Sequence, residues 1–557
     1  MTRRVLKSVA SLAMTAMLLA CRADSIPDPP DIAKPNGPFS VSIDVDAGTV
    51  LRKIPRTLYG ANVEWFYDGN ALWDQQAGGL NMSAIGAAKE LNISLVRFPG
   101  GGLTDYYHWR DGIGPQAERP VRPHGMDDGR SANHFGTDEL LALCKQIDAE
   151  PLISVNLSRG TPQEAVDWIR YVQHTDPGAT YWELGNEPYL NQKGSINFNA
   201  ASYAEKVVSF SSAMRAADPR IQIIAAGGEN FGRFQFVKQA DWDKVLLTAA
   251  APSIDYLAVH NGYAPVLIGR SEGDGFYTVY RALFAFPTLV SQNFHDLDHE
   301  IDTYAPVRAT HIRLAVTEWA PLFQVVPSSH WIDHAKTLGS AIFVARMLQT
   351  FISEPRMDIA NYFKLTEPSF LGLIGPHGER KVPYYAFQMF TQHFGSDLVA
   401  TRTASPTFAS DPVGVVAAVK DAPFVSAISS LSADHSRLYL MLVNTSFADS
   451  ANVAFTLKGF TPASEAMQWQ LAGSSPDENN GDDLLRIPGL NWAKQEESPI
   501  HRSFAGGHAE AVHPTMQQVH NAAAKMTFTA PPLSIVAFEF TREGSEHSTT
   551  AGQRGGQ

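Results

Sequence analysis

The sequence lacks the excess of basic residues that a nucleic-acid-binding protein needs. It contains 44 lysines and arginines against 57 aspartates and glutamates, which gives a formal net charge of −13. Because the phosphate backbone is bound through a basic surface, this balance argues against a nucleic-acid partner. An acidic surface is also a poor match for polyanionic substrates, so charge favours neutral ligands. The sequence shows no clustered acidic loop with the spacing of metal ligands, and no metal ion or cofactor is expected.

Cysteine is almost absent, with only Cys21 and Cys144 in 557 residues. Cys21 closes an N-terminal segment that has the order of an export signal: a positive start between residues 3 and 7, then the short apolar run 9–20. The run is too short to span a bilayer as a mature helix. The residues Leu18–Cys21 resemble the lipobox of bacterial lipoproteins, in which the cysteine carries the lipid; an ordinary cleaved signal is the alternative. With Cys21 lipidated, Cys144 has no intrachain partner and no internal disulfide is possible.

We therefore expect an exported protein, either anchored by its lipid to the bacterial cell envelope, at the outer membrane, or periplasmic. The membrane would be contacted only through the lipid anchor.

From about residue 58 to 395, short apolar runs alternate with longer helical patterns. Residues 139–144 open an amphipathic helix, and Pro151–Asn156 follows as a strand. Thr161 then has the features of a helix N-cap, with Pro162 at the first helical position and Glu164 placed to complete a capping box. Alternation over this length predicts parallel strands joined by helices, and hence a (β/α)8 TIM barrel. The other expected strands are 95–98, 181–187, 221–226, 254–260, 312–317 and 359–365.

After residue 395 no long helical period is found, and the runs 437–444, 452–457 and 533–540 read as strands between turn-rich stretches. This pattern predicts a C-terminal β-sandwich, which the early strand 39–45 is expected to join. The polar end of the chain is expected to be disordered. The predicted division is a signal peptide 1–21, a proline-rich tether 22–38, an N-terminal strand segment 39–57, the barrel 58–395, the sandwich 396–541 and a tail 542–557.

Two glutamates stand at the ends of expected barrel strands, where the chemistry of such barrels is found. Glu187 ends the fourth strand and Glu318 ends the seventh. Strands four and seven face one another across the mouth of the barrel. The two carboxyl groups can therefore reach the separation of about 5–5.5 Å that hydrolysis of a glycosidic bond with retention requires. A pair of structural surface glutamates is the alternative.

The triplet Asn186-Glu187-Pro188 resembles the acid/base signature of the clan A glycoside hydrolases. The resemblance implies that Glu187 is the acid/base, that Asn186 binds the sugar 2-hydroxyl, and that Glu318 is the nucleophile. Glu318 would attack the anomeric carbon while Glu187, its pKa raised, protonates the leaving oxygen.

Longer segments are similar to one family of that clan, glycoside hydrolase family 51, the α-L-arabinofuranosidases. The similarity covers nearly all of the mature chain. It implies cleavage of terminal α-L-arabinofuranosyl or related residues from plant-type polysaccharides or oligosaccharides, and a sugar contact from Glu64. The segments that carry it are Leu58–Glu64, Val96–Gly101, Tyr107–Pro115, Asn133–Glu139, Ala149–Pro151, Val155–Leu157 and Ala530–Ile535.

Other polar and aromatic residues at strand ends are candidates for the site. Arg97, with its fixed charge, could bond the nucleophile and keep it ionised, or could be an ordinary ion pair of the barrel. His260 and Tyr263 could orient Glu318 or contact sugar hydroxyls, although a core histidine is the alternative for the first. The remaining expected substrate contacts are Asn156 and Trp319, the latter by stacking on a sugar face.

The sequence also departs from family 51 at several contacts. Gly102 stands where the family has an asparagine, and Tyr263 lies one place later than in the family's His-x-Tyr pattern. Pro188 is more usual elsewhere in the clan, and the expected eighth strand 361–367 does not match. These changes keep another clan A activity open: a β-xylosidase, a β-glucuronidase or an endo-β-glycanase. A glycan-binding surface lipoprotein that has lost catalysis is the alternative from a different class.

Overall fold

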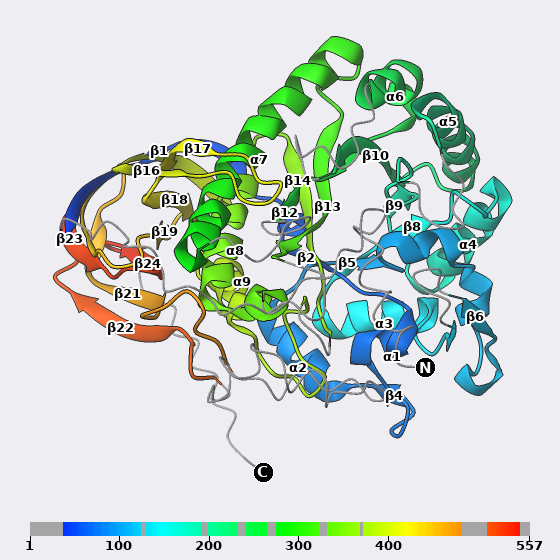
Figure 1. Ribbon diagram of the computed structural model, residues 1–557, viewed down its shortest axis with the longest axis horizontal. Coiled ribbons are helices and arrows are strands. Elements are labelled where there is room, and N and C mark those ends of the chain that lie inside the picture. The colour runs from blue at the N-terminus through cyan, green and yellow to red at the C-terminus, as the bar shows by residue number, and fades with distance from the viewer. Residues whose placement is uncertain are drawn as a thin grey trace.

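Eight parallel strands close into a barrel in the computed structural model of the chain (Figure 1). They follow one another around the barrel in chain order, and the pairing of Asn361 with Gly60 joins the last strand to the first. This arrangement confirms the predicted (β/α)8 barrel. The strands are β2 (Gly60–Asn62), β5 (Leu95–Phe98), β8 (Glu150–Val155), β9 (Tyr181–Leu184), β10 (Gln222–Asn230), β11 (Tyr256–His260), β13 (Arg313–Pro321) and β14 (Met357–Tyr362), with β12 (Gly262–Ala264) extending beside β13.

Helices cover the outside of the barrel and connect its strands (Figure 1). They are α2 (Met82–Leu91), α3 (Thr137–Ile147), α4 (Pro162–Thr175), α5 (Ala200–Ala217), α6 (Trp242–Ala250), α7 (Phe276–Tyr304), α8 (Leu338–Ser353) and α9 (Val382–Gln392). The segment labelled α1 (Phe66–Ala71) is a left-handed turn, with φ between 48° and 64° at Tyr67, Asp68, Gly69 and Asn70.

The start of α4 differs in one detail from its prediction. Thr161 Oγ1 accepts the backbone N–H of Glu164 at 3.1 Å, as expected for an N-cap. The carboxylate of Glu164, however, turns to His108, with Oε1 2.8 Å from Nδ1, instead of reaching back to Thr161. The capping box is therefore formed only in its first half, because the histidine competes for the glutamate.

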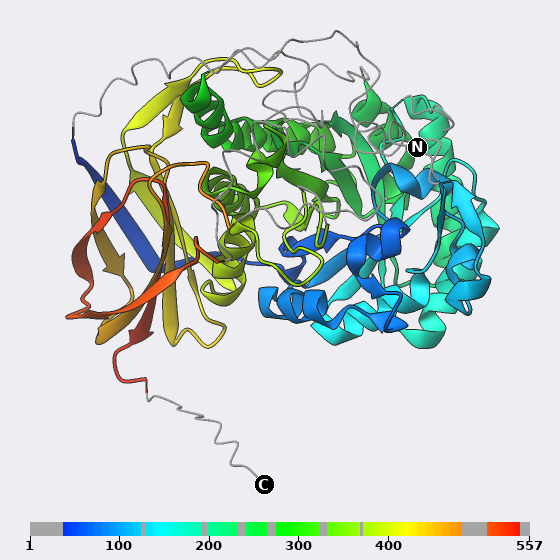
Figure 2. The same cartoon turned by 60° about the horizontal axis from the view of Figure 1, so that its bottom comes forward.

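The second region is rich in strands, and the N-terminal strand β1 (Phe39–Lys53) lies within it. In Figure 2 the blue β1 lies among yellow and orange strands that come almost 400 residues later. It pairs antiparallel with β15 and parallel with β20. The other strands of this sheet are β15 (Asp397–Ala404), β18 (Val425–Leu431), β19 (Arg437–Asn444), β20 (Ala451–Lys458), β21 (Pro462–Ala472), β22 (Thr515–His520), β23 (Lys525–Ala530) and β24 (Ser534–Arg542).

Strand β19 shows how this region packs against the barrel. Leu440 and Leu442 face a core internal to the strands, together with Phe538 of β24. Met441 and Val443, at the alternate positions, join the large core that includes the barrel helices. Both faces of the strand are therefore buried, which accounts for its unbroken apolar run. Short two-stranded ladders complete the fold: β3 (Trp73–Asp74) with β4 (Gly79–Leu80), β6 (Val121–Pro123) with β7 (Arg130–Ala132), and β16 (Thr407–Ser410) with β17 (Val419–Pro423).

The structure describes residues 37–123, 130–190, 198–230, 241–264, 275–323, 331–367, 371–480 and 510–545. The predicted signal peptide with Cys21, the tether up to residue 36 and the tail from residue 546 lie outside the described residues. Within those ranges, no helix combines the length and the apolar character needed to cross a bilayer.

Candidate functional site

Glu187 and Glu318 meet at the end of the barrel where the strands stop. Glu187 follows β9, Glu318 lies near the end of β13, and both side chains are buried. Donor atoms of Glu187, Glu318 and His260 all lie within 4.8 Å of one another. That spacing is close to the carboxyl separation of about 5–5.5 Å in retaining glycosidases and shorter than the roughly 6.5–9.5 Å of inverting ones.

These three side chains also have the donor atoms of a metal site. They are the one such group of three or more His, Cys, Asp or Glu residues among the described parts of the chain. The guanidinium of Arg97 lies 2.8 Å from Glu318, however, and its positive charge opposes binding of a cation there. The arrangement is better suited to holding and moving protons.

A β-bulge on β13 turns Glu318 into the barrel. Between Val316 and Trp319 the strand has one residue more than its partner β14, where the matching pair is Ala360 and Tyr362. Ala315 faces the barrel interior, so regular alternation would point Thr317 inward and Glu318 outward. The extra residue brings both side chains to the site, as bulges do beside many active sites.

Arg97, at the end of β5, bonds three acceptors of the site. Nε donates to Glu183 Oε2 at 2.6 Å, Nη1 to Glu318 Oε1 at 2.8 Å, and Nη2 to Asn186 Oδ1 at 2.8 Å. The side chain is wholly buried, and Ser154 also donates to Glu183. A guanidinium suits this position because its rigid fork serves several oxygens at once and stays charged.

Asn186 is oriented by its bond to Arg97. Since its Oδ1 accepts from the guanidinium, its Nδ2 must point elsewhere, and within the described residues this buried group has no hydrogen-bond partner. A buried donor without a partner is costly, and an oxygen of a ligand bound beside Glu187 would satisfy it.

The backbone at Glu187 is strained. Its φ of 43° lies in the left-handed region, two residues after Gly185 with φ 78°. A non-glycine residue pays about 1–2 kcal/mol for this conformation. The side chain is held from the other end by His260, whose Nδ1 lies 2.8 Å from Glu187 Oε1. Strain of this kind is common where a side chain must be aimed for function.

His260 and Tyr263 each form a hydrogen bond to a different one of the two carboxylates. Tyr263 donates its O–H to Glu318 Oε2 at 2.7 Å, whereas His260 bonds Glu187 and lies 3.9 Å from Glu318 Oε2. The close approach of Gly262 to Trp319 makes this possible, because a Cβ on Gly262 would lie 2.5 Å from Cβ of Trp319. The displaced tyrosine of the sequence thus still reaches the nucleophile candidate.

The surroundings give the two glutamates opposite proton affinities. Burial raises the pKa of Glu187, and the nearby charge of Glu318 adds to this, although the bond to His260 opposes it. Burial also acts to raise the pKa of Glu318, but the charges of His260 and Arg97 and the bond from Tyr263 outweigh it and hold that pKa below its ordinary value. Burial acts to lower the pKa of His260, but the two carboxylates raise it overall.

Glu64 borders the same space as Glu318. A Cβ on Gly101 would lie 3.6 Å from Glu318 Oε1 and 3.8 Å from Glu64 Oε1. The other carboxylate oxygen of Glu64 accepts from Asn70 at 3.0 Å and pairs with Lys364 Nζ at 2.5 Å. Glu64 is thus fixed by one oxygen while the other faces the site. Lys364 was not among the residues predicted from the sequence. The one sign of it in the sequence was the mismatch of the expected eighth strand with family 51.

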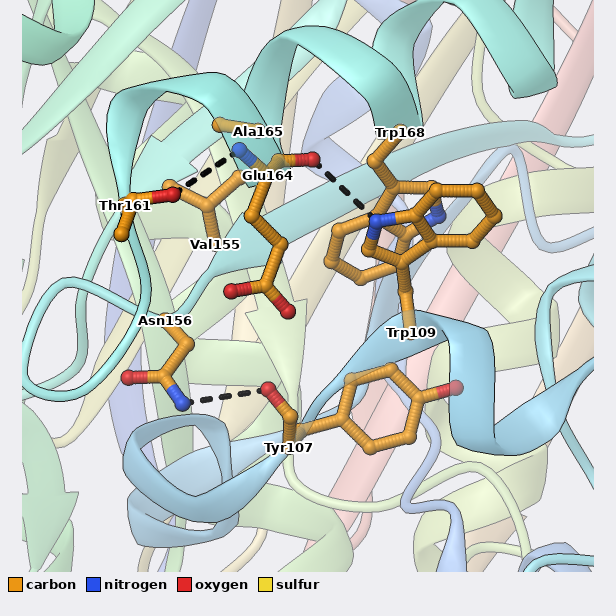
Figure 3. Close-up of a pocket in the computed structure, with 8 residues that line it drawn as sticks. All are labelled: Tyr107, Trp109, Val155, Asn156, Thr161, Glu164, Ala165 and Trp168. Carbon is orange, nitrogen blue, oxygen red and sulfur yellow. Dashed lines mark hydrogen bonds between the residues drawn. The ribbon is translucent and has the colours of Figure 1, made fainter.

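Asn156 and Trp319 are engaged in other contacts. Asn156 donates to Tyr107 O at 3.1 Å and accepts from the backbone of Arg159 at 2.8 Å, so its amide stabilises a turn. Figure 3 shows it at the edge of a small pocket, lined also by Tyr107, Trp109, Val155, Thr161, Glu164, Ala165 and Trp168.

Trp319 points away from the carboxylates. The bulge turns it outward, where its ring packs in the core against Phe351 of α8 and Phe387 of α9. The expected stacking on a sugar is therefore wrong for this tryptophan, since no sugar can reach a ring buried between the barrel wall and two helices.

Comparisons with known proteins find similar chains among alpha-L-arabinofuranosidases. A family model described as the alpha-L-arabinofuranosidase 1 domain matches residues 87–246. The chain is 25% identical over 452 residues to a probable alpha-L-arabinofuranosidase C of Aspergillus terreus, covering 76% of this chain and 86% of that protein.

The fold has solved counterparts. The crystal structure of the alpha-L-arabinofuranosidase of Thermotoga maritima in complex with arabinose is similar with a TM-score of 0.73 and 24% identity, over 90% of this chain and 99% of that one. A family 51 alpha-L-arabinofuranosidase of Bifidobacterium longum gives 0.73 and 20% over the same shares of the two chains.

Replacing Arg97 with methionine should destabilise the protein by about 3–5 kcal/mol, because it leaves buried carboxylates without their counter-charge. Urea denaturation at neutral pH measures this. The matched control is Arg437→Met, which removes a pair 3.0 Å from Glu539 on a half-exposed arginine and should cost no more than about 1 kcal/mol. Equal losses in the two variants would contradict the role given to Arg97.

Proposed function

We propose that this chain, a clan A glycoside hydrolase similar to family 51, removes terminal α-L-arabinofuranosyl residues from polysaccharides or oligosaccharides by double displacement. The observation that carries the proposal is the Glu187–Glu318 pair. One oxygen of each carboxyl lies within 4.8 Å of one oxygen of the other, which fits the short separation in retaining enzymes. Their surroundings favour a proton on Glu187 and a charge on Glu318.

In the first step, Glu318 attacks the anomeric carbon as a carboxylate. Its oxygen forms a bond to that carbon while the bond between the carbon and the leaving oxygen breaks. The leaving oxygen takes the proton of Glu187. Arg97 and Tyr263 hold Glu318 by one oxygen each, so the carboxylate is aimed and kept ionised.

In the second step, Glu187 is a carboxylate and accepts a proton from water. The water oxygen bonds to the anomeric carbon, the ester bond to Glu318 breaks, and the sugar leaves with its original configuration. The unpaired Nδ2 of Asn186 is placed to donate to a sugar hydroxyl, and Glu64 Oε1 is placed to accept from one.

A second activity within clan A is favoured by one feature. Lys364, which follows β14 in the segment that departs most from family 51, adds a buried cation beside Glu64. A panel of nitrophenyl glycosides separates the candidates. Cleavage of the arabinofuranoside supports the arabinofuranosidase proposal, whereas cleavage of the xyloside or the glucuronide alone contradicts it and supports the second activity. Glycan binding without hydrolysis of any substrate would instead support a non-catalytic binding protein.

The export signal and Cys21 favour a lipid-anchored position at the cell envelope. With the full chain expressed in a lipoprotein-processing bacterium, Cys21→Ser should move the protein from the membrane fraction to the soluble fraction and abolish labelling by palmitate. Cys144→Ser, the other cysteine, is the matched control and should leave both readouts unchanged. An unaltered distribution of the Cys21 variant would refute the anchor.

Glu318→Ala and Glu187→Ala should each reduce kcat by about 10³-fold or more on the cleaved glycoside, because each removes a reacting group. Azide should restore part of the activity of both, giving a glycosyl azide of inverted configuration from the first and of retained configuration from the second. NMR of the products makes the distinction. Glu539→Gln, a carboxylate of the strand-rich region, should retain activity. Full activity in either alanine variant is incompatible with the assignment.

Tyr263→Phe should shift the acidic limb of the kcat/KM profile to higher pH. The hydroxyl helps hold the pKa of Glu318 below its ordinary value, so its removal raises that pKa and the carboxylate is protonated at a higher pH. Activity is therefore lost on the acidic side first. Tyr384→Phe removes a comparable buried bond, to Ala87 O at 2.9 Å, and should leave the profile in place. The proposed role of Tyr263 fails if the two variants have the same acidic limb.

A further inference from the structure

Thr317 is the residue next to the nucleophile candidate, and its hydroxyl and carbonyl are both engaged. Its Oγ1 lies 3.0 Å from Nε2 of His260, and its carbonyl accepts from Asn62 Nδ2 at 3.0 Å. The residue is wholly buried. Asn62 lies on β2, which only β14 separates from β13, and His260 lies on β11 at the other side of β13. The backbone of Thr317 is therefore held from one side while its hydroxyl meets the histidine on the other.

The histidine that Thr317 meets connects the two catalytic candidates. Nδ1 of His260 lies 2.8 Å from Glu187 Oε1 and 3.9 Å from Glu318 Oε2. The charged groups that face it among the described residues are Glu187 after β9, Glu318 on β13 and Arg97 on β5. Because Nε2 faces Thr317, Nδ1 is the ring nitrogen that contacts Glu187, the acid/base candidate.

We propose that Thr317 is a positioning residue of the reaction, whose hydroxyl accepts the N–H at Nε2 of His260 and so reserves Nδ1 for proton exchange with Glu187. The proposal rests on the proposed function and deepens it. When Nε2 keeps its proton, Nδ1 can take a proton from Glu187 or return it, and one proton is held between the two atoms.

The consequence concerns departure of the leaving group. Before glycosylation the shared proton is on Glu187 and passes to the leaving oxygen as its bond to the anomeric carbon breaks. If Thr317 no longer holds Nε2, the histidine can rotate or change tautomer, and Nδ1 then donates permanently to Glu187. Protonation of the leaving oxygen becomes less effective, which matters for poor leaving groups and little for good ones.

The test compares Thr317→Val, which removes the hydroxyl at nearly constant shape, with Thr317→Ser, which keeps it. The measurement is kcat/KM for a series of aryl glycosides of the cleaved sugar, from dinitrophenyl to unsubstituted phenyl. The valine variant should lose about tenfold or more on the phenyl glycoside relative to the dinitrophenyl one. The serine variant should restore the leaving-group dependence of the parent enzyme. A uniform loss on all substrates, as expected of a merely structural threonine, overturns the proposal.

A second measurement does not depend on activity. Nitrogen-15 NMR of histidine-labelled protein, with the His260 signals assigned from a His260→Gln variant, reports which ring nitrogen carries the proton. The parent and Thr317→Ser should show a protonated Nε2 throughout the titration, with Nδ1 as the titrating atom. Thr317→Val should lose this preference, and Thr317→Ala takes its place if the valine variant does not fold.

An unprotonated Nε2 in the parent protein refutes the positioning role. If the parent hydrolyses no glycoside, the proposed function has failed, and the NMR result alone decides whether Thr317 fixes the histidine.

Discussion

The contact of one buried guanidinium with three acceptors is the interaction on which the site depends. Arg97 meets Glu183 on β9, Asn186 just beyond it and Glu318 on β13, with all four side chains shielded from water. Burying a charge is expensive unless it is paired and its hydrogen bonds are satisfied. Closure of the barrel brings these strand ends together. The fold therefore supplies the partners that offset the burial of the charge, and it also fixes the positions of the site residues.

The contacts of Arg97 also give the two glutamates, Glu318 and Glu187, different surroundings. Glu318 receives hydrogen bonds from Arg97 and Tyr263, which favour its charged form. Glu187 is bonded by His260, lies in a strained backbone conformation, and is buried against the charge of Glu318. Two carboxylates with environments that push their pKa values apart are the general pattern of an acid and a nucleophile working together.

The barrel was predictable from sequence because alternating strands and helices leave strong periodic signals, and strand ends then mark the mouth. This is why Glu187, Glu318, Arg97, His260 and Tyr263 could be singled out as neighbours. The bulge on β13 could not be foreseen, since one extra residue leaves no mark on composition. It moved Trp319 into the core and brought Glu318 into the site beside Thr317. The turn contacts of Asn156 were not foreseen either, because an asparagine at a strand end serves a turn as readily as a ligand.

The part of the site around Glu64 is built separately from the part around Glu187 and Glu318. Glu64 is fixed by Lys364 from β14's connection and by Asn70, which lies in the left-handed turn after β2. That turn is itself strained, and it is held by contacts such as the bond between Asp68 and His134. A cation and an amide thus aim this carboxylate as Arg97 and Tyr263 aim Glu318, but with parts from loops and not from strand ends. Loops vary more freely than the strands they join. The pair Glu187 and Glu318 could therefore be predicted from the strand ends of the sequence, whereas the partners of Glu64 could not, because only the folded loops define their positions.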